Sequence, residues 1–419
     1  MTGRSLAFLP VLLGLAYLAS SVDQAIFQAV GLPPLYGQAA LMGLGLVGLF
    51  VALVTKDRTL GAGGERNTRP VILIMTVYLL LTVVSFLYSP QDEIVVDILV
   101  QRVKFALFLM LAIGYLQMPD FRRGFEFVSI GLVALSSLLC LFDFVQPTFS
   151  SVPGRGAGFY INPNEAGIAI ILLALIASQP LRPTLCLALW SVASVGVLLT
   201  FSRGAWLILI ICLMGLTLAG KFGGGRARFV FVGFVTMIFG LVFSAYLSGD
   251  LYLWVVKSPV ADLLDANTLS RLGQRGLDID DYSTLERQDV LALGIARFVS
   301  SPFIGHGVGS TISWEESVGT HNMIVMLGAE LGILGVGLYL ALFVLLLLRT
   351  RGSPRLIALA ALVSGLTSHN QFDIIALAIP LAYAASTMRR SPRTAGRYTQ
   401  PPARQNEVSR RALSAHLAR

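Results

Sequence analysis

Apolar runs long enough to cross a bilayer recur along almost the whole chain, and they constrain its fold more than any other feature. The hydrocarbon core of a membrane is about 30 Å thick, so a helix needs roughly 20 apolar residues to cross it. Only 13% of the 419 residues are charged and 55% are apolar, more than a water-soluble domain could bury. We predict membrane-spanning helices at residues 6–22, 38–54, 70–88, 98–117, 125–145, 164–179, 183–201, 203–220, 228–247, 321–348, 355–369 and 371–388.

The predicted fold is an all-α polytopic membrane protein with about 12 transmembrane helices. Arg4 and the first apolar run also fit a cleavable secretory signal, but the many later spans favour an uncleaved helix. The transmembrane domain is expected to cover residues 1–388. Residues 389–419 are rich in arginine and proline, and we expect a disordered basic tail there.

The distribution of basic residues predicts that both termini are cytoplasmic. In that orientation 22 of the 31 lysines and arginines are cytoplasmic, whereas 18 of the 23 acidic residues lie outside or near outer helix ends. Short cytoplasmic loops that are rich in lysine and arginine are the usual determinant of orientation. The net charge of +8 is then explained by loops and a tail that contact anionic membrane lipid, so no nucleic-acid partner is predicted.

Residues 248–320 form one large hydrophilic loop on the outer side. Apolar residues at helical spacing between Leu285 and Val299 predict a partly buried helix of about 14 residues that packs on the membrane domain. The acidic cluster Asp278, Asp280 and Asp281 lacks the glycine and the distal glutamate of a calcium loop, which favours a solvated surface. No two histidines have the spacing of a zinc site, so no metal is predicted.

Nine basic residues depart from the charge pattern, because they lie in outer loops or at outer helix ends. A fixed arginine in such a place is a suitable partner for a phosphate or a carboxylate. The nine residues are Arg102, Lys104, Arg155, Arg203, Lys257, Arg271, Arg275, Arg287 and Arg297.

Three places in the outer segments are candidates for a site. Arg155 lies among glycines, which let the backbone approach a polar ligand closely. Arg203 lies in a tight hairpin between two spans, where it either snorkels to the interface or receives the diphosphate of a lipid. His321 opens a long apolar helix and serves either as an interfacial residue or in a site, while Glu165 suits a helix start.

Four segments, taken in order, resemble motifs of the O-antigen ligase and polymerase family. They are the arginine and glycine loop that ends in NPNEAG, the hairpin TFSRGAW, the segment ERQDVLALGIARFVSSPFIGHGVGS, and a helix that opens with His321 and Asn322 and has Gly332 eleven residues after the histidine. The resemblance covers residues 150–350, and the expected number of spans and the large outer loop agree with it.

This resemblance implies a metal-independent glycosyltransferase of the bacterial cytoplasmic (inner) membrane that needs no cofactor. Such an enzyme transfers a glycan from an undecaprenyl diphosphate carrier to an acceptor on the periplasmic side. The acceptor is either a sugar hydroxyl of the lipid A core, in O-antigen ligation, or another lipid-linked repeat, in polymerisation of O antigen or exopolysaccharide. We favour ligation.

The resemblance also implies roles for individual residues. Carried over by motif, Arg203 and Arg287 would hold the diphosphate, and His321 would orient or deprotonate the acceptor hydroxyl. By the same resemblance Arg155, Asn164 and Asn322 would bind the diphosphate or the glycan. Two further residues, Arg102 and Lys104, belong to no motif and are included only because of their outer-side position.

A secondary transporter is the main alternative from another functional class. Twelve spans with both ends inside describe many transporters, but no repeat relates the two halves of this chain. A non-catalytic scaffold would not require Arg203, Arg287 and His321 to meet. If these residues act on one diphosphate and one acceptor, their side chains must converge on a single cavity.

Overall fold

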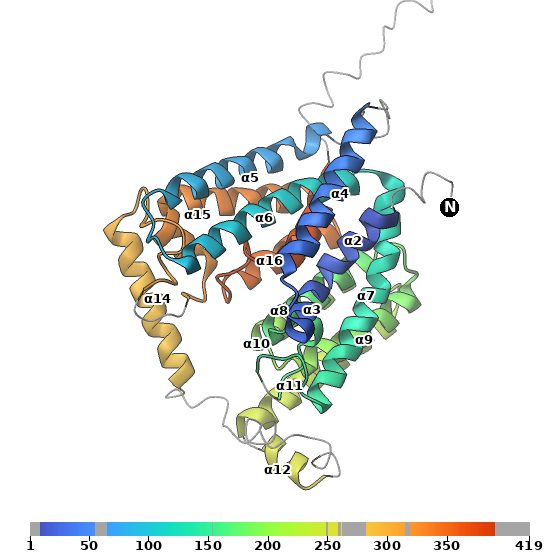
Figure 1. Ribbon diagram of the computed structural model, residues 1–419. Coiled ribbons are helices and arrows are strands. Elements are labelled where there is room, and N and C mark those ends of the chain that lie inside the picture. Colours follow the sequence, from blue (N-terminus) through green and yellow to red (C-terminus); the bar gives the residue numbers. More distant parts are fainter. Residues whose placement is uncertain are drawn as a thin grey trace, which may run out of the picture.

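The computed structural model describes residues 9–54, 65–152, 154–248, 250–258, 261, 282–314 and 319–389, and these residues form helices and loops without any strand. The predicted tail beyond Arg389 and the acidic cluster at 278–281 lie outside the described residues, as does much of the large loop 248–320. In chain order (Figure 1) the elements are α2 (Leu9–Ala19), α3 (Val22–Val30), α4 (Pro34–Val54), α5 (Glu65–Phe86), α6 (Glu93–Leu116), α7 (Pro119–Val145), the 3-10 turn η1 (Gly158–Tyr160), α8 (Pro163–Ala177), α9 (Pro183–Leu199), α10 (Arg203–Leu218), α11 (Arg226–Ser248), α12 (Asp250–Val256), α14 (Tyr282–Ser300), α15 (Met323–Arg349), α16 (Ser353–Ser364) and α17 (Ile375–Ser386).

The predicted all-helical fold is confirmed for the described residues, and each of the twelve predicted apolar segments coincides with one helix. Among the described residues, three helices, within α5, α7 and α15, are long and apolar enough to cross a membrane. The number rises to four if α2 and α3, bent by 71°, form one broken span. Seven shorter apolar helices accompany them. Large apolar side chains face outward from α5, where Leu73 is 64% and Leu80 is 60% exposed. These helices indicate a membrane protein, while twelve crossings and the orientation remain predictions.

Two helices lie in the interior of the bundle. Every residue of α8 from Ala166 to Ala177 is buried, and so is every residue of α17 from Ile375 to Ala385. A helix that is apolar on all sides is expected to be surrounded by other helices. Accordingly, α8 packs against α7, α9, α10 and α16, and α17 packs against α6. In Figure 1, α5, α6 and α15 run together on one side of this interior, and α7 and α9 lie on another.

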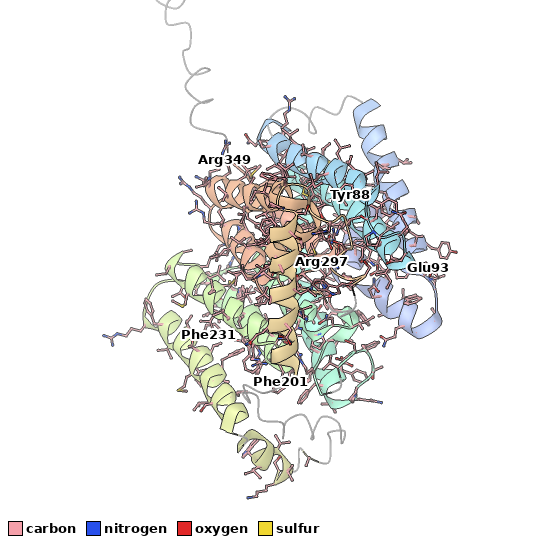
Figure 2. The ribbon with its side chains drawn as sticks, turned by 90° about the vertical axis from the view of Figure 1, so that its left-hand side faces the viewer. Tyr88, Glu93, Phe201, Phe231, Arg297 and Arg349 are labelled. Carbon is pink, nitrogen blue, oxygen red and sulfur yellow. The ribbon has the colours of Figure 1, made fainter. Side chains whose placement is uncertain are left out.

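The helix expected in the large outer loop is α14, which has 19 residues rather than about 14. It packs against α15. Figure 2 shows α14 along one side of the molecule, with Arg297 towards one of its ends and Phe201 beside the other. The first turns of α14, which include Arg287, therefore lie near the start of α10.

A break in α15 connects two glycine-containing motifs, the one with Gly332 and the glycine-rich strip 301–311. Gly332 has φ 65° and ψ −162°, a conformation that in practice only glycine adopts. The break leaves the Ala329 carbonyl free of the helix ladder, and it accepts from the backbone N–H of His306 at 2.8 Å. Beyond the break, the Ile333 N–H donates to the Pro302 carbonyl, also at 2.8 Å. The glycine-rich strip 301–311 is therefore hydrogen-bonded to the opened part of α15.

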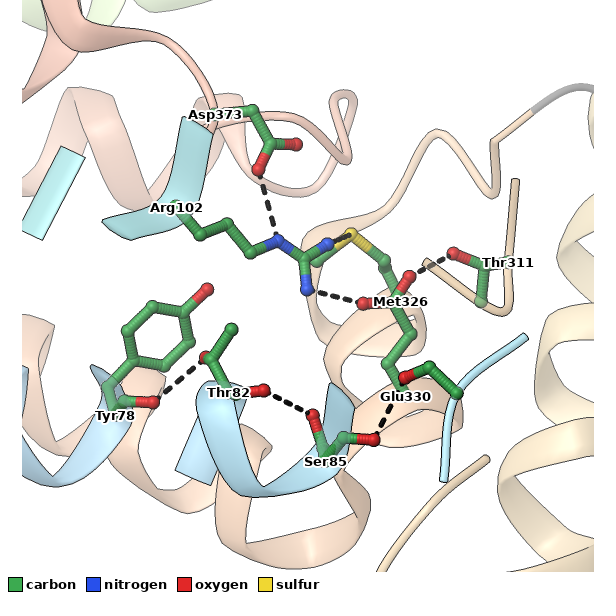
Figure 3. A network of polar contacts seen from close by, with 9 residues as sticks. Tyr78, Thr82, Ser85, Arg102, Thr311, Met326, Glu330 and Asp373 are labelled. Atoms are coloured by element: carbon green, nitrogen blue, oxygen red, sulfur yellow. Dashed lines mark hydrogen bonds and ion pairs between the residues drawn. The ribbon is translucent and has the colours of Figure 1, made fainter. Parts of the chain in front are cut away.

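A buried ionic network connects α6, α15 and the segment before α17 (Figure 3). The guanidinium of Arg102 is fully buried, with Nη1 at 2.5 Å from Glu330 Oε2 and Nε at 3.1 Å from Asp373 Oδ1. The second oxygen of Glu330 accepts a hydrogen bond of 2.6 Å from the Thr311 hydroxyl. Arg102, which its outer-side position suggested for a substrate site, thus lies in the protein interior, where two carboxylates hold its side chain.

Candidate active site

One cavity of about 560 Å³ brings together residues from distant parts of the chain. Arg203 and Arg287 are 84 residues apart, and His321 follows Arg287 by another 34, yet all three line it. Arg155 and Asn164 lie in the same wall. The expected convergence on one cavity is thus observed, whereas the chemical roles of these residues remain predictions. The wider lining comprises Gly154, Asn162, Glu165, Ile168, Phe201, Ser202, Gly204, Ala205, Trp206, Ser364, Thr367, Ser368, His369, Asn370, Gln371, Ile374 and Leu377.

The loop that carries Arg155 is shaped by one buried carboxylate at the end of α7. Oδ1 of Asp143 accepts from the backbone N–H groups of residues 148, 149 and 150 at 2.7–3.2 Å. Its Oδ2 accepts from the N–H groups of Ala157 and Gly158 at 2.9 and 3.2 Å. A carboxylate that accepts from so many N–H groups fixes the loop between α7 and α8, including the start of η1. Asp143 thereby holds Arg155 at the cavity.

Arg155 joins three segments of the cavity wall. Its Nε donates to the Thr200 carbonyl at 2.7 Å, and its Nη2 donates to Asn164 Oδ1 at 2.8 Å. Thr200 precedes α10, and Asn164 lies in the first turn of α8. The guanidinium therefore orients these neighbours and also faces the cavity, where its charge favours an anion.

The starts of two helices point at this cavity. Asn162 caps α8 by accepting from the Asn164 N–H at 2.9 Å, and Ser202 caps α10 by accepting from Ala205 N–H at 3.4 Å. Arg203 is the first residue of α10. Helix starts carry a partial positive charge and unpaired N–H groups, which makes them suitable for binding anions. Both starts therefore add to the positive potential of Arg155, Arg203 and Arg287.

Two histidines face each other in the wall. The rings of His321 and His369 have centroids 5.4 Å apart and stand at 87° to each other. His321 has φ 51°, a left-handed conformation that is uncommon for a residue with a side chain and that is often retained at functional sites. Burial, together with the nearby His321 and Arg102, lowers the pKa of His369 to about 4, so its ring is neutral at physiological pH. Among the described residues, no group hydrogen-bonds Nδ1 of His369.

Two parts of this wall were not expected to belong to the site. The first is Glu165, whose Oε1 accepts from the side-chain amide of Asn370 at 3.0 Å. The second is the segment 367–371, which reads TSHNQ and joins α16 to α17. Five consecutive polar residues between two apolar runs, on the side that the charge pattern places outside, were a signal that could have identified this segment.

Two other predicted site residues lie elsewhere. Asn322 does not line the cavity, because its side chain caps α15 by accepting from the N–H groups of Ile324 and Val325 at 3.0 and 3.2 Å. Lys104 lines a second cavity, where its ammonium group donates to Gln38 Oε1 at 2.9 Å. The side-chain oxygen of Asn322 is thus engaged in a helix cap, and Lys104 belongs to the wall of the second cavity.

Taken together, the fold and the cavity define an all-helical membrane protein with an arginine-rich and histidine-containing site at the starts of two helices. Among the described residues, no three side chains of His, Cys, Asp or Glu are grouped so that they could hold a metal ion. No protein-family model and no curated protein matches the chain. The resemblance to the O-antigen ligase and polymerase family therefore stays a prediction that depends on the four motifs.

Proposed function

We propose that the protein transfers a glycan from an undecaprenyl diphosphate carrier to a sugar acceptor on the periplasmic side of the bacterial inner membrane. The reaction we favour is O-antigen ligation to the lipid A core. The observation that carries this proposal is the meeting of Arg155, Arg203 and Arg287 with His321 in one cavity of about 560 Å³. A site for a diphosphate needs several cations, and a site for transfer to a hydroxyl needs a proton acceptor beside them.

The positions of these residues in the chain support the proposal. Arg155 precedes α8, Arg203 begins α10, and His321 precedes α15. The charge pattern places all three of these helix ends on the outer side. A carrier lipid with its tail in the bilayer would present its diphosphate at such a boundary.

The proposed reaction is a single displacement. The oxygen of an acceptor hydroxyl attacks the anomeric carbon, and the bond between that carbon and the phosphate oxygen breaks. The electron pair of the broken bond leaves with the diphosphate, whose charge Arg203 and Arg287 stabilise, and the hydroxyl proton passes to the imidazole of His321. A guanidinium group can donate two parallel hydrogen bonds to the oxygens of a phosphate, so the arginines can stabilise this leaving group directly.

The decisive experiment is transfer by the purified protein in lipid nanodiscs. The donor is undecaprenyl diphosphate-linked O antigen, and the acceptor is lipopolysaccharide that carries core sugars only. His321→Ala should slow transfer by roughly 10²–10⁴-fold while donor binding persists, because the arginines remain. Arg287→Lys keeps the charge but loses paired hydrogen bonds, and it should weaken donor binding. The matched control is Arg123→Lys, an exposed arginine outside the cavity, which should leave both values unchanged.

Three results would contradict the proposal. Wild-type protein that transfers nothing to core lipopolysaccharide or to a second carrier-linked glycan would refute glycan transfer. Activity that a chelator abolishes and Mg²⁺ or Mn²⁺ restores would refute stabilisation of the diphosphate by arginines alone. Uptake of a small solute into proteoliposomes that Arg203→Lys abolishes would favour the transporter alternative.

A further inference from the structure

A second cavity of about 740 Å³ adjoins the first. The two share Asn162, Glu165, Asn370 and Ile374 in their linings. The hydrogen bond of 3.0 Å between Asn370 and Glu165 lies in this common wall. A molecule held in the second cavity would therefore lie against a wall that also lines the cavity of the three arginines.

A chain of hydrogen-bonded polar side chains lies in the wall of the second cavity. Asp23 and Gln38 are buried, with 4% and 3% of their surfaces exposed, and the Gln38 amide donates to Asp23 Oδ2 at 2.5 Å. Lys104 donates to the carbonyl end of the same amide at 2.9 Å. Three consecutive polar groups at the wall of an apolar bundle are costly to bury, which indicates a requirement for polar recognition.

The charge of the second cavity differs from that of the first. Besides the phenol of Tyr160, its ionisable lining consists of the carboxyl groups of Asp23, Asp97, Glu165 and Asp373 and the ammonium group of Lys104. Such a lining disfavours a diphosphate. Carboxylate, amide and ammonium groups side by side instead match the hydroxyls of a sugar, each of which can donate and accept.

Backbone conformation provides an independent connection between the cavities. Among the described residues, four that are not glycine have a left-handed φ, between 47° and 63°. Ser21 and Ile161 line the second cavity, and Phe201 and His321 line the first. Backbone strain of this kind costs about 1–3 kcal/mol per residue and is retained where the surrounding structure requires it, often at functional sites. Its restriction to these two walls suggests that they form one functional unit.

We infer that the second cavity binds the sugar of the acceptor, with Asp23, Gln38 and Lys104 recognising its hydroxyls. The acceptor hydroxyl reaches the first cavity across the wall formed by Glu165 and Asn370. This inference depends on the proposed transfer reaction, in which the first cavity holds the diphosphate of the donor. It assigns donor and acceptor to different walls, so substitutions in each should affect different kinetic constants.

The test compares Lys104→Met and Asp23→Asn with wild-type protein in nanodiscs, with transfer measured against acceptor concentration. One arm uses lipopolysaccharide with core sugars only, and the other uses undecaprenyl diphosphate-linked repeat as the acceptor. Loss of a hydrogen bond to a charged group corresponds to about a tenfold to hundredfold weaker binding. The acceptor KM should therefore rise by this factor in one arm, while donor Kd and kcat stay within about twofold. The arm that responds identifies the source of the sugar.

Arg203→Lys is the matched control and should give the opposite result, with a weaker donor and an unchanged acceptor KM. Intact donor binding by Lys104→Met and Asp23→Asn shows that these variants fold. An acceptor KM that stays within about twofold in both arms, or a donor Kd that rises instead, would overturn the inference. If wild-type protein transfers nothing, binding of the same two probes decides: weaker binding by Lys104→Met supports a sugar site, and equal binding refutes it.

Discussion

Replacing Arg102 by Met should destabilise the protein strongly, because it removes the only cation of a buried network that the described residues define. Arg102 and Glu330 are fully buried, and Asp373 is 9% exposed. Methionine fills a similar space but leaves two carboxylates without their cation. Loss of one partner of a buried ion pair costs about 3–5 kcal/mol. Equilibrium unfolding in mixed micelles, with SDS as the denaturant, should show a loss of this size in the free energy of unfolding.

Two further variants test whether the loss of stability comes from the broken ion pairs or from the removal of any arginine. Arg123→Met removes an exposed arginine of α7 and should change the free energy of unfolding by less than about 0.5 kcal/mol. Combining Arg102→Met with Glu330→Gln and Asp373→Asn neutralises the buried acids and should recover part of the loss. If Arg102→Met unfolds like wild-type protein and weakens donor binding instead, Arg102 belongs to the substrate site and the structural role is wrong.

Three other substitutions test separate parts of the structure. Gly332→Ala should lower the free energy of unfolding by at least about 1–3 kcal/mol, because a Cβ there would overlap the Phe303 backbone. Its control is Gly337→Ala on the same helix, where a Cβ meets nothing within 4 Å, and this variant should be as stable as wild-type protein in the same unfolding assay. The free energy of unfolding of the wild-type protein should fall by up to about 3 kcal/mol as the pH falls from 6.5 to 4, because His369 becomes protonated in the unfolded chain but not in the folded chain. His369→Gln should lose correspondingly less stability on acidification, as measured by melting temperature. A cysteine in place of Asp280 should react with a membrane-impermeant thiol reagent in cells with a permeabilised outer barrier, because residues 248–320 are predicted to lie on the outer side. The three native cysteines are buried and should give little background labelling. Labelling only after lysis of the inner membrane would overturn the orientation.

Hydropathy could predict the helices because each predicted segment is long and predominantly apolar. It could not predict the bend of 71° between α2 and α3, because Ser20 and Ser21 look like an ordinary end of a span. The break at Gly332 was equally hidden, since glycine is common in membrane helices. Its backbone conformation depends on the strip 301–311, which is distant in the sequence and pairs with the opened helix.

Charge pattern and motifs together could predict which arginines meet, but not which charged residues stay inside the bundle. Arg203 and Arg287 lie beside helix ends and line the cavity, as expected. Arg102 is near an outer helix end by the same reasoning, yet the structure turns it inward to Glu330 and Asp373. Both acids lie more than 200 residues away in the sequence, so no local pattern could reveal these partners. A charged residue within an apolar run has two explanations, and only the fold decides between them.

Two of the buried polar groups of the bundle, Asp143 and Arg102, each fix a segment that lines the candidate site or adjoins it. Asp143 holds the loop that carries Arg155 through five backbone N–H groups. Arg102 holds the segment before α17 through Asp373, and through Glu330 it acts on the strip that contains Thr311. The site is therefore built from loops and helix starts, and buried groups on the helices hold these loops in place. Substitutions in these buried groups should accordingly lower both stability and transfer, whereas substitutions of Arg203 or Arg287 should impair donor binding and transfer and leave stability unchanged.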